Sequence, residues 1–320
     1  MGGTVTPYLA IDCGSNSFKV VAARVKGNGN LEILETRREK VRLGQFAFTD
    51  DQLIPQDYIE GEVIPAFQNF QAMALRNQVA MQNTKAVGTS ALRDAKNGEA
   101  LVEAVEKATG IHIDIIDSDE EGDLVFRAVK ATLPQRKALI IDIGGGSVEL
   151  ILTKKGEIAR VDSLELGAVR LLQLFKEKAD NQVELAALIG THARRFNKRI
   201  VEFKGRKEIE VCIATGGNSN ALRDIEAQQM GKKSAARMTL VKLNRIALML
   251  QGLSVRERME QFQFKSDRSD VIFPAALILR YIMQAVACTD LVIPNVGLKE
   301  GLIYKIHEEA EVSEESKAVA

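Results

Sequence analysis

Two stretches of the chain carry the same pattern of apolar and polar positions. Residues 10–20 read AIDCGSNSFKV, and residues 140–150 read IIDIGGGSVEL. In each, an apolar strand ends in a tight polar turn and a second, largely apolar strand follows, which predicts a β-hairpin. At an offset of 130 residues the repeat aligns Asp12 with Asp142, Gly14 with Gly144, and Ser17 with Ser147. Two copies of one supersecondary unit indicate two related domains with similar turns.

Strand-like and helix-like stretches alternate along the rest of the chain. The pattern predicts helices at 58–77, 98–109, 168–177, 184–201, 218–229, 239–251 and 274–287, and a final helix from about 299. It predicts strands at 80–87, 111–116, 209–214 and 291–294. This alternation, with a hairpin opening each half, is typical of a two-domain α/β protein.

The turns of the two hairpins are rich in glycine and serine. The first consists of Gly14, Ser15, Asn16 and Ser17, and the second of Gly144, Gly145, Gly146 and Ser147. A third turn, Gly216 and Gly217 followed by Asn218 and Ser219, comes after a strand and opens a helix. Backbone N–H groups in such turns can converge on an anion, and a helix N-terminus adds its dipole. One such turn alone is more often a plain hairpin turn or helix cap, but three favour phosphate binding.

Carboxylates accompany the turns. Asp12 and Asp142 come just before the first and second turns, and Glu149 lies on the strand that returns from the second. In a hairpin, Asp142 and Glu149 come close enough to share a divalent cation, and Mg²⁺ is often held by few carboxylates together with phosphate oxygens. The alternative is a hairpin carboxylate paired with a lysine. That alternative suits Asp142 poorly, because its strand is otherwise apolar.

The acidic stretch Asp117–Gly122 lies between a predicted strand and a helix. Ser118 and Glu121 have the spacing of a capping box, which would give Glu121 a purely structural role. The other interpretation is that one carboxylate of this stretch faces the cleft between the domains and activates water.

Taken together, these segments resemble the exopolyphosphatase/guanosine pentaphosphate phosphatase (Ppx/GppA) family, in its short two-domain form. The resemblance extends over roughly residues 8–307. It is carried by the segments 10–18, 87–97, 118–122, 140–149, 165–170, 215–219 and 297–301, in this order and spacing.

The resemblance implies two ribonuclease H-like (actin-like ATPase) domains with an interdomain cleft. It places one domain at 1–124 and the other at 125–302, with a helix at about 303–312 that packs back on the first. It implies release of terminal phosphate from inorganic polyphosphate, conversion of pppGpp to ppGpp, or both. The cofactor would be Mg²⁺ or Mn²⁺, and a homodimer is possible.

The same resemblance assigns roles to residues. Glu121 matches the catalytic glutamate and Arg93 an arginine directed at substrate phosphates. Asp142 and Glu149 match the carboxylates associated with Mg²⁺, to which Asp12 is added as a further candidate. The sequence departs from the family pattern at Val148, Asn218 and Asn220, which affects substrate identity more than activity. The alternatives are an ATP-dependent kinase of the same superfamily and a non-catalytic protein that senses nucleotides or alarmones.

Composition and charge narrow the possible partners. The chain has 320 residues, with 43 Lys and Arg against 43 Asp and Glu. This neutrality disfavours DNA or a long basic polyphosphate channel, but phosphate recognition by backbone turns, one metal and a few arginines needs little net charge. Basic residues cluster at 192–207, more typical of a solvated helix face than of a substrate track, and the acidic tail 308–320 is expected to be frayed or solvated. The three scattered cysteines, and the absence of a secretory signal or a charge-free apolar span, predict a cytoplasmic protein that is not in a membrane.

Overall fold

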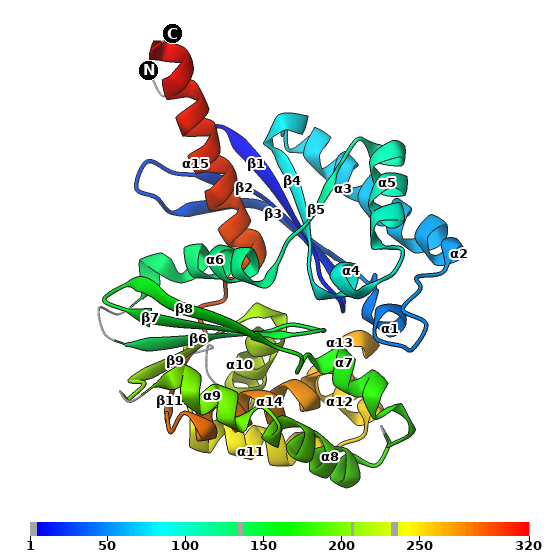
Figure 1. Ribbon diagram of the computed structural model, residues 1–320, viewed down its shortest axis with the longest axis vertical. Helices are drawn as coiled ribbons and strands as arrows, with labels where there is room; N and C mark the ends of the chain where they lie inside the picture. Colours follow the sequence, from blue (N-terminus) through cyan, green and yellow to red (C-terminus); the bar gives the residue numbers. More distant parts are fainter. Residues whose placement is uncertain (1–4, 134–136, 179, 206–207, 232–235, 320) are drawn as a thin grey trace. The chain divides into compact units, whose positions relative to one another are not determined.

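The computed structural model describes residues 5–133, 137–178, 180–205, 208–231 and 236–319 (Figure 1). Across these residues the chain divides into two compact units. Unit 1 consists of Met1–Ala128 and Leu298–Ala320, and unit 2 of Val129–Gly297. The sequence placed the corresponding boundaries after residues 124 and 302.

Unit 1 is built on one mixed sheet in the order β3-β2-β1-β4-β5. Its strands are β1 (Pro7–Cys13), β2 (Phe18–Val25), β3 (Leu31–Glu39), β4 (Thr84–Gly88) and β5 (Ile113–Ile115). The hairpin predicted at the first repeat is confirmed, because β1 and β2 pair antiparallel, and β4 and β5 continue the sheet in parallel. The helices are α1 (Gly44–Ala47), α2 (Gln56–Tyr58), α3 (Ile64–Arg76), α4 (Ser90–Asp94), α5 (Gly98–Thr109), α6 (Ser118–Val129) and α15 (Leu298–Val319).

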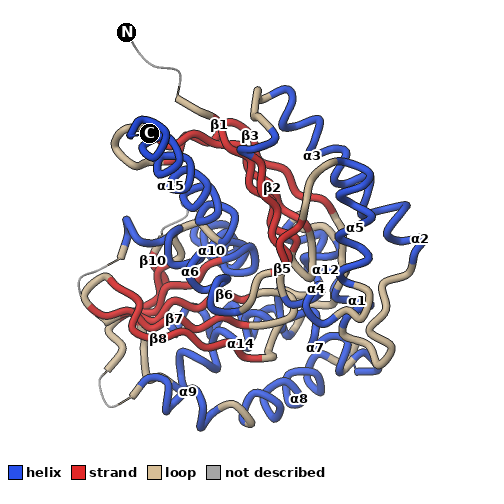
Figure 2. Tube along the Cα trace, turned by 45° about the horizontal axis from the view of Figure 1, so that its top comes forward, coloured by secondary structure: helices blue, strands red, loops and turns tan. Residues whose placement is uncertain are grey.

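The two faces of this sheet bury different helices. Leu9, Ile11 and Cys13 of β1 share a core with Phe67 and Phe70 of α3. The alternating residue Tyr8 faces the other way, and its hydroxyl lies 3.2 Å from Nδ1 of His307 on α15. Figures 1 and 2 accordingly show α3 and α5 on one side of the sheet and α15 on the other.

The C-terminal segment differs in part from the sequence prediction. The acidic tail was expected to be frayed or solvated; α15 continues to Val319, and residues 308, 309 and 311–313 are exposed. Its acidic side chains have basic partners within unit 1, since Glu308 pairs with Arg127 and Glu309 pairs with Lys85 at 2.6 Å. The ion pairs are exposed and contribute little, so the buried residues Leu302, Ile303 and Ile306 earlier in the helix attach it to unit 1.

Unit 2 repeats the architecture with a mixed sheet in the order β10-β11-β9-β6-β7-β8. Its strands are β6 (Ala138–Ile143), β7 (Val148–Lys154), β8 (Glu157–Leu164), β9 (Val211–Thr215), β10 (Arg237–Thr239) and β11 (Asp290–Val292). The second predicted hairpin is confirmed by antiparallel pairing of β6 with β7. The helices are α7 (Ala168–Leu174), α8 (Gln182–Arg194), α9 (Asn197–Lys204), α10 (Gly216–Met230), α11 (Leu240–Gln251), α12 (Val255–Phe262), α13 (Ser266–Ser269) and α14 (Ile272–Ala285).

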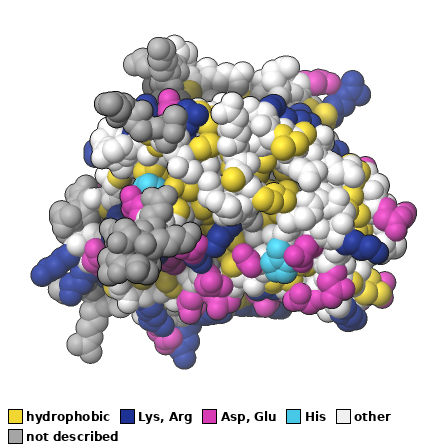
Figure 3. Space-filling view, turned by 90° about the horizontal axis from the view of Figure 1, so that it is seen from above, with side chains coloured by type: hydrophobic (Ala, Val, Ile, Leu, Met, Phe, Trp, Pro, Cys, Tyr) yellow, Lys and Arg dark blue, Asp and Glu magenta, His cyan; other side chains and the backbone are white. Residues whose placement is uncertain are grey.

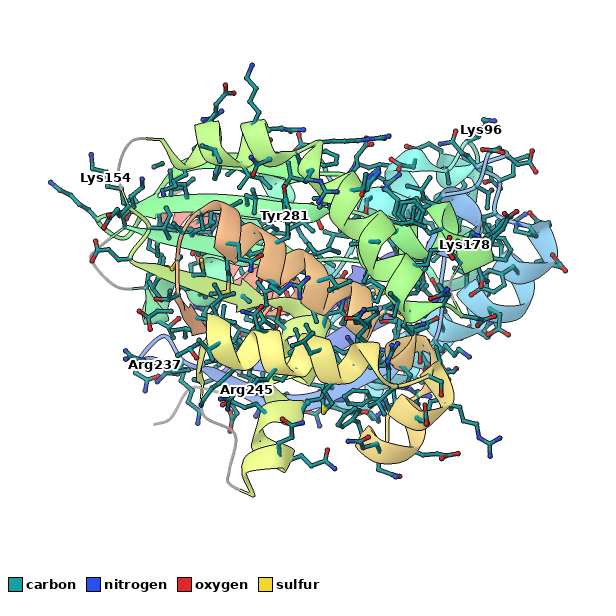
Figure 4. All side chains as sticks on the ribbon, turned by 90° about the horizontal axis from the view of Figure 1, so that it is seen from below. Lys96, Lys154, Lys178, Arg237, Arg245 and Tyr281 are labelled. Carbon is teal, nitrogen blue, oxygen red and sulfur yellow. The ribbon has the colours of Figure 1, made fainter. Side chains whose placement is uncertain are left out.

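Helix α14 forms the centre of the helical layer in unit 2. Ten of its residues, including Ile272, Phe273 and Leu279, are buried. It packs against α8, α9 and α11. Figure 4 shows this arrangement, with α14 (orange, carrying the labelled Tyr281) between α11 (yellow) and the green helices α8 and α9.

Two predicted helices are interrupted in the structure. The stretch 58–77 consists of the end of α2, a π-helical turn at Ile59–Val63, and α3. Pro65 lies in the first turn of α3, where its missing N–H is tolerated. The stretch 184–201 divides into α8 and α9. The apolar pattern continues across both interruptions, so periodicity alone did not show them.

Candidate active site

Two carboxylates and two hydroxyl residues form a row across the sheet of unit 2, which we call the carboxylate row. Asp142 on β6 is directly opposite Glu149 on β7. On the outer sides of this pair, Thr215 on β9 is opposite Asp142, and Ser163 on β8 is opposite Glu149. Residues paired in this way project from the same face of a sheet. The register therefore brings Asp142 and Glu149 together, as the spacing in the sequence predicted.

Two hydroxyl groups orient these carboxylates. Thr215 Oγ1 donates to Asp142 Oδ1 at 2.5 Å, and Ser163 Oγ donates to Glu149 Oε1 at 3.1 Å. Glu149 is fully buried and Asp142 is only 8% exposed. Burying a charge is costly unless hydrogen bonds or a counter-charge compensate it. The row is therefore a preorganised pair of acids rather than an ordinary surface feature.

The donor set of this row is compatible with a small hard cation. Among the described residues, no group of three or more His, Cys, Asp or Glu lies close enough to form a complete protein cage for a metal. Magnesium does not require such a cage, because it is usually held by one or two carboxylates and completes its shell with water and phosphate oxygens. Asp142 and Glu149 fit that requirement.

The second glycine turn directs its carbonyl groups toward the start of α7. The backbone N–H groups of Gly167, Ala168 and Val169 donate to the carbonyls of residues 146, 144 and 145. Arg170 Nε also donates to the carbonyl of Gly146, at 2.7 Å. Since C=O and N–H of a trans peptide point in opposite directions, the N–H groups of residues 145–147 point away from α7, whereas the N–H of Gly144 donates to the carbonyl of Ser147. This orientation is compatible with the predicted anion site.

Gly167 makes this packing possible. A Cβ at residue 167 would overlap the backbone of Gly145 and Gly146. We expect Gly167→Ala to displace the second turn and to destabilise the protein by about 1–3 kcal/mol, as overpacking usually does. Thermal unfolding measures the loss of stability, and the rate of phosphate release measures the effect of displacing the turn.

Gly190→Ala provides the matched control for this substitution. Gly190 lies within α8, and among the described residues no atom other than the nearby backbone of α8 itself lies within 4 Å of its Cβ position. Alanine should raise stability there by about 0.5–1 kcal/mol and leave activity unchanged. Equal stability and activity in the two variants would contradict the assigned role of Gly167.

An arginine from α13 lies beside the third glycine turn, which forms the N-terminus of α10. The sequence did not indicate this arginine. Gly216 has φ 83°, and its Cβ position lies 2.9 Å from Asp142 Oδ1. The Cβ position of Gly217 lies 2.7 Å from Arg268 Nη2. Arg268 Nη1 donates to Asn218 Oδ1 at 2.6 Å. An anion at this helix N-terminus would therefore meet a guanidinium as well as backbone N–H groups.

A buried arginine supports the segment that bears Arg268. Arg258 is 1% exposed and donates to the carbonyls of Leu250, at 2.6 Å, and of Ser269, at 3.2 Å. Its guanidinium carbon lies 5.1 Å from the ring centroid of Phe273. Burial lowers the pKa of Arg258 to about 10. These contacts fix the short helix α13, which ends one residue after Arg268.

In unit 1 the first turn is tied to its neighbours by hydroxyl groups. Ser15 Oγ lies 3.1 Å from Ser90 Oγ on α4, and the carbonyl of Ser15 accepts from the N–H of Gly44 at 2.9 Å. Arg38 Nε donates to Ser17 Oγ at 3.0 Å. Ser15 and Ser17 are both buried. The turn is therefore held in one conformation, with an arginine beside it.

The carboxylate before the first turn has a different environment from its counterpart in unit 2. Asp12 is opposite Lys19 in the β1–β2 register, and the two side chains form an ion pair at 2.9 Å. Lys19 occupies the position that Glu149 has in the second repeat. This contact corresponds to the alternative of a hairpin carboxylate paired with a lysine. A metal role for Asp12 stays a prediction, and the lysine beside it does not favour one.

Glu121 lies in the first turn of α6 and is 4% exposed. The predicted capping box is wrong, because α6 begins at Ser118 and Asp117 Oδ1 accepts from the N–H groups of Asp119 and Glu120, each at 2.9 Å. Glu121 therefore does not cap the helix. Its Oε2 accepts a hydrogen bond of 3.1 Å from Arg93 Nη1 on α4. Arg93 Nη1 also donates to the carbonyl of Ile116 at 2.6 Å. The structure thus brings together the two residues that the resemblance marks as catalytic.

The family model that describes the Ppx/GppA phosphatase family matches residues 20–310. This chain belongs to the Ppx/GppA phosphatase family. Among curated proteins it is similar to the guanosine-5'-triphosphate,3'-diphosphate pyrophosphatase of Aliivibrio fischeri, with 28% identity over 317 residues, 97% of this chain and 61% of that protein. The enzyme of that name from Vibrio parahaemolyticus is 28% identical over 311 residues, 96% of this chain and 60% of that protein. The chain thus spans about three fifths of the length of these relatives.

Solved structures of this family share the fold over nearly the whole chain. An exopolyphosphatase from Cytophaga hutchinsonii matches with a TM-score of 0.82 at 24% identity, covering 95% of this chain and 98% of that one. The Ppx/GppA family member from Aquifex aeolicus matches with a TM-score of 0.74 at 24% identity, covering 96% and 99%. The predicted fold class, two actin-like α/β domains, is confirmed.

Surface charge in this Ppx/GppA chain is mixed. On the face in Figure 3, acidic side chains lie among basic ones. In the basic cluster at 192–207, Arg199 pairs with Asp162, and Lys198 lies 3.8 Å from Glu202. Such pairs are typical of a solvated helix face. Residues 206 and 207 of the cluster lie outside the described residues. No helix in the described part of the chain is long and apolar enough to cross a membrane.

Several residues at these sites were not found by sequence reasoning. For Lys19 a signal existed, because the 130-residue offset aligns it with Glu149. Gly167 and Thr215 lie inside segments that carry the family resemblance, but neither was assigned a function. Arg268 and Ser163 had no local signal. Both reach their positions through contacts between elements far apart in the sequence.

Proposed function

We propose that this protein is a phosphoanhydride hydrolase that releases terminal orthophosphate. Its substrate would be inorganic polyphosphate, pppGpp, or both. Family membership supports the reaction class, and the names of the relatives, a guanosine pentaphosphate pyrophosphatase and an exopolyphosphatase, support the two substrates.

The observation that carries this proposal is the carboxylate row of unit 2. Asp142 and Glu149 are oriented by Thr215 and Ser163, and both lie within two residues of the 144–147 turn that joins their strands. A pair of oxygen ligands beside an anion-binding turn is the arrangement that a phosphate–Mg²⁺ complex needs. Here we propose that Asp142 and Glu149 hold Mg²⁺ or Mn²⁺. When bound, the cation would neutralise charge on the transferring phosphoryl group.

Unit 1 supplies the groups that would handle water. Glu121 is a buried carboxylate held by Arg93 in a defined orientation, which suits a base that positions and deprotonates the attacking water. Arg93 retains further guanidinium donors for substrate phosphate oxygens. The turn at 14–17, with Lys19 and Arg38 beside it, would neutralise and orient the remaining phosphates. In such reactions, positioning and charge stabilisation provide most of the catalysis.

The test is a parallel assay of orthophosphate release from polyphosphates of defined length and from pppGpp, with and without Mg²⁺. We expect metal-dependent release from at least one of them. Phosphate transfer to an acceptor without net release would instead indicate a kinase. Binding of pppGpp with no turnover at any Mg²⁺ concentration would indicate a nucleotide sensor. Either result would overturn the proposal.

A further inference from the structure

Helices α6 and α15 of unit 1 approach each other at one glycine. A Cβ at residue 301 would overlap the carbonyl oxygen of Leu124, and the nearest atoms around that position all belong to the backbone of Leu124. Glycine within a helix costs about 0.5–1 kcal/mol relative to alanine. Here the close approach of two backbones explains why the position requires glycine.

The partner in this contact is the helix that carries Glu121. Leu124 lies three residues after Glu121, and residues with this spacing share a face of a helix. A helix moves as a semi-rigid rod, so a shift of α6 at Leu124 displaces the Glu121 carboxylate as well. Glu121 makes a hydrogen bond of 3.1 Å to Arg93 that such a shift would lengthen or break.

An ion pair also joins the same two helices, since Arg127 of α6 pairs with Glu308 of α15. Lys305 of α15 lies 3.8 Å from Glu120, an exposed contact that adds little. Figures 1 and 2 both show the beginning of α15 beside α6.

Helix α15 is itself fixed to the sheet of unit 1. Leu302, Ile303 and Ile306 are buried, and α15 packs against β1 and β2. The hydroxyl of Tyr8 on β1 lies 3.2 Å from His307. A continuous set of contacts therefore runs from β1 through α15 to α6 and Glu121.

We propose that Gly301 is a positioning residue for catalysis: it sets the distance between α15 and α6, and thereby the position of Glu121. This inference rests on the proposed function, in which Glu121 activates water. A displacement of about 1 Å at a catalytic group can lower the rate about 10²-fold. Gly301 touches neither substrate nor metal in this scheme, so substrate binding is expected to be retained.

The experiment is a double-mutant cycle of Gly301→Ala with Glu121→Gln, with rates expressed per folded protein from circular dichroism. In the wild-type background we expect Gly301→Ala to lower kcat at least tenfold and to change KM less than twofold. In the Glu121→Gln background the same substitution should change kcat less than twofold, because its effect passes through Glu121. Gly190→Ala, an alanine at an open helix position, should have no effect in either background.

Gly301→Ala can fail to fold, and Glu308→Gln then takes its place. This substitution removes the charge that pairs with Arg127 of α6 and leaves the pair of Arg127 with Asp123 on α6 in place, and we expect it to lower kcat severalfold in the wild-type background only. Equal loss of kcat in both backgrounds, or no loss in a folded variant, overturns the positioning role. Failure of the proposed function is distinguishable, because it would appear as unchanged activity in Glu121→Gln alone.

Discussion

Replacing Glu121 by glutamine should lower the rate of orthophosphate release by about 10²-fold or more. Loss of a general base typically costs about 10²–10⁴-fold. Glutamine has nearly the same shape and keeps an oxygen that can accept from Arg93, so the fold and the binding of substrate should be retained. The measurement is kcat under saturating substrate and Mg²⁺, with thermal unfolding as the check on the fold.

Glu120→Gln is the matched control for this experiment. Glu120 precedes Glu121 on α6 but is exposed, and its ion pair with Lys305 at 3.8 Å is weak. We expect kcat within twofold of wild type for this variant. A folded Glu121→Gln protein that also retains kcat within twofold would remove Glu121 from the mechanism.

Replacing Asp142 by asparagine should shift the dependence of the reaction on Mg²⁺. Asparagine keeps the oxygen that accepts from Thr215 Oγ1 but removes the negative charge, so it weakens the proposed cation site without emptying the space. Even loss of a residue that only orients a metal ligand costs about 10–100-fold in metal affinity. We therefore expect the half-saturating Mg²⁺ concentration to rise at least 10-fold and kcat to fall. Mg²⁺ titrations of phosphate release measure both effects.

Two threonine variants sharpen this test. Thr215→Val removes the hydroxyl that orients Asp142, and it should raise the half-saturating Mg²⁺ concentration by about 10–100-fold. Thr153→Val removes another buried hydroxyl of the same sheet, which donates to the carbonyl of Ala138 at 3.2 Å. It should lower stability but leave the Mg²⁺ dependence unchanged. An equal shift in the two variants, or unchanged Mg²⁺ dependence in Asp142→Asn, would rule out metal binding by this row.

The pairing of Asp142 with Glu149 is a feature that the sequence alone could predict. Two apolar strands joined by a short turn can form only a few registers, and the observed one places Ile143 opposite Val148 at the turn. Once that hairpin is formed, Asp142 and Glu149 must be opposite each other. The prediction succeeded because every interaction that it needed is local.

The acid on α6 shows where local reasoning fails. Ser118 and Glu121 have the spacing of a capping box, but Asp117 caps the helix and Glu121 pairs with Arg93, which is 28 residues away. The acidic tail is a similar case, because Arg127 and Lys85 pair with it across the sequence. On α6 a neighbouring residue takes the cap and a partner distant in sequence binds the Glu121 carboxylate. The ion pairs of the tail are exposed, so they accompany the helix and contribute little to its stability.

The sequence by itself determined the duplicated hairpins and the three glycine turns, because these depend on periodicity and on the conformations that glycine allows. Phosphate and metal binding by these segments stays a prediction. Only the tertiary structure decided which of these groups have partners. Parallel pairing of β9 with β6 brings Thr215 to Asp142, and the packing of α13 on the start of α10 brings Arg268 to Gly217. The backbone contact of Gly301 with Leu124 likewise joins two elements that are far apart in the sequence. Such contacts depend on how whole elements pack, and a pattern along one chain does not encode that packing in any short window.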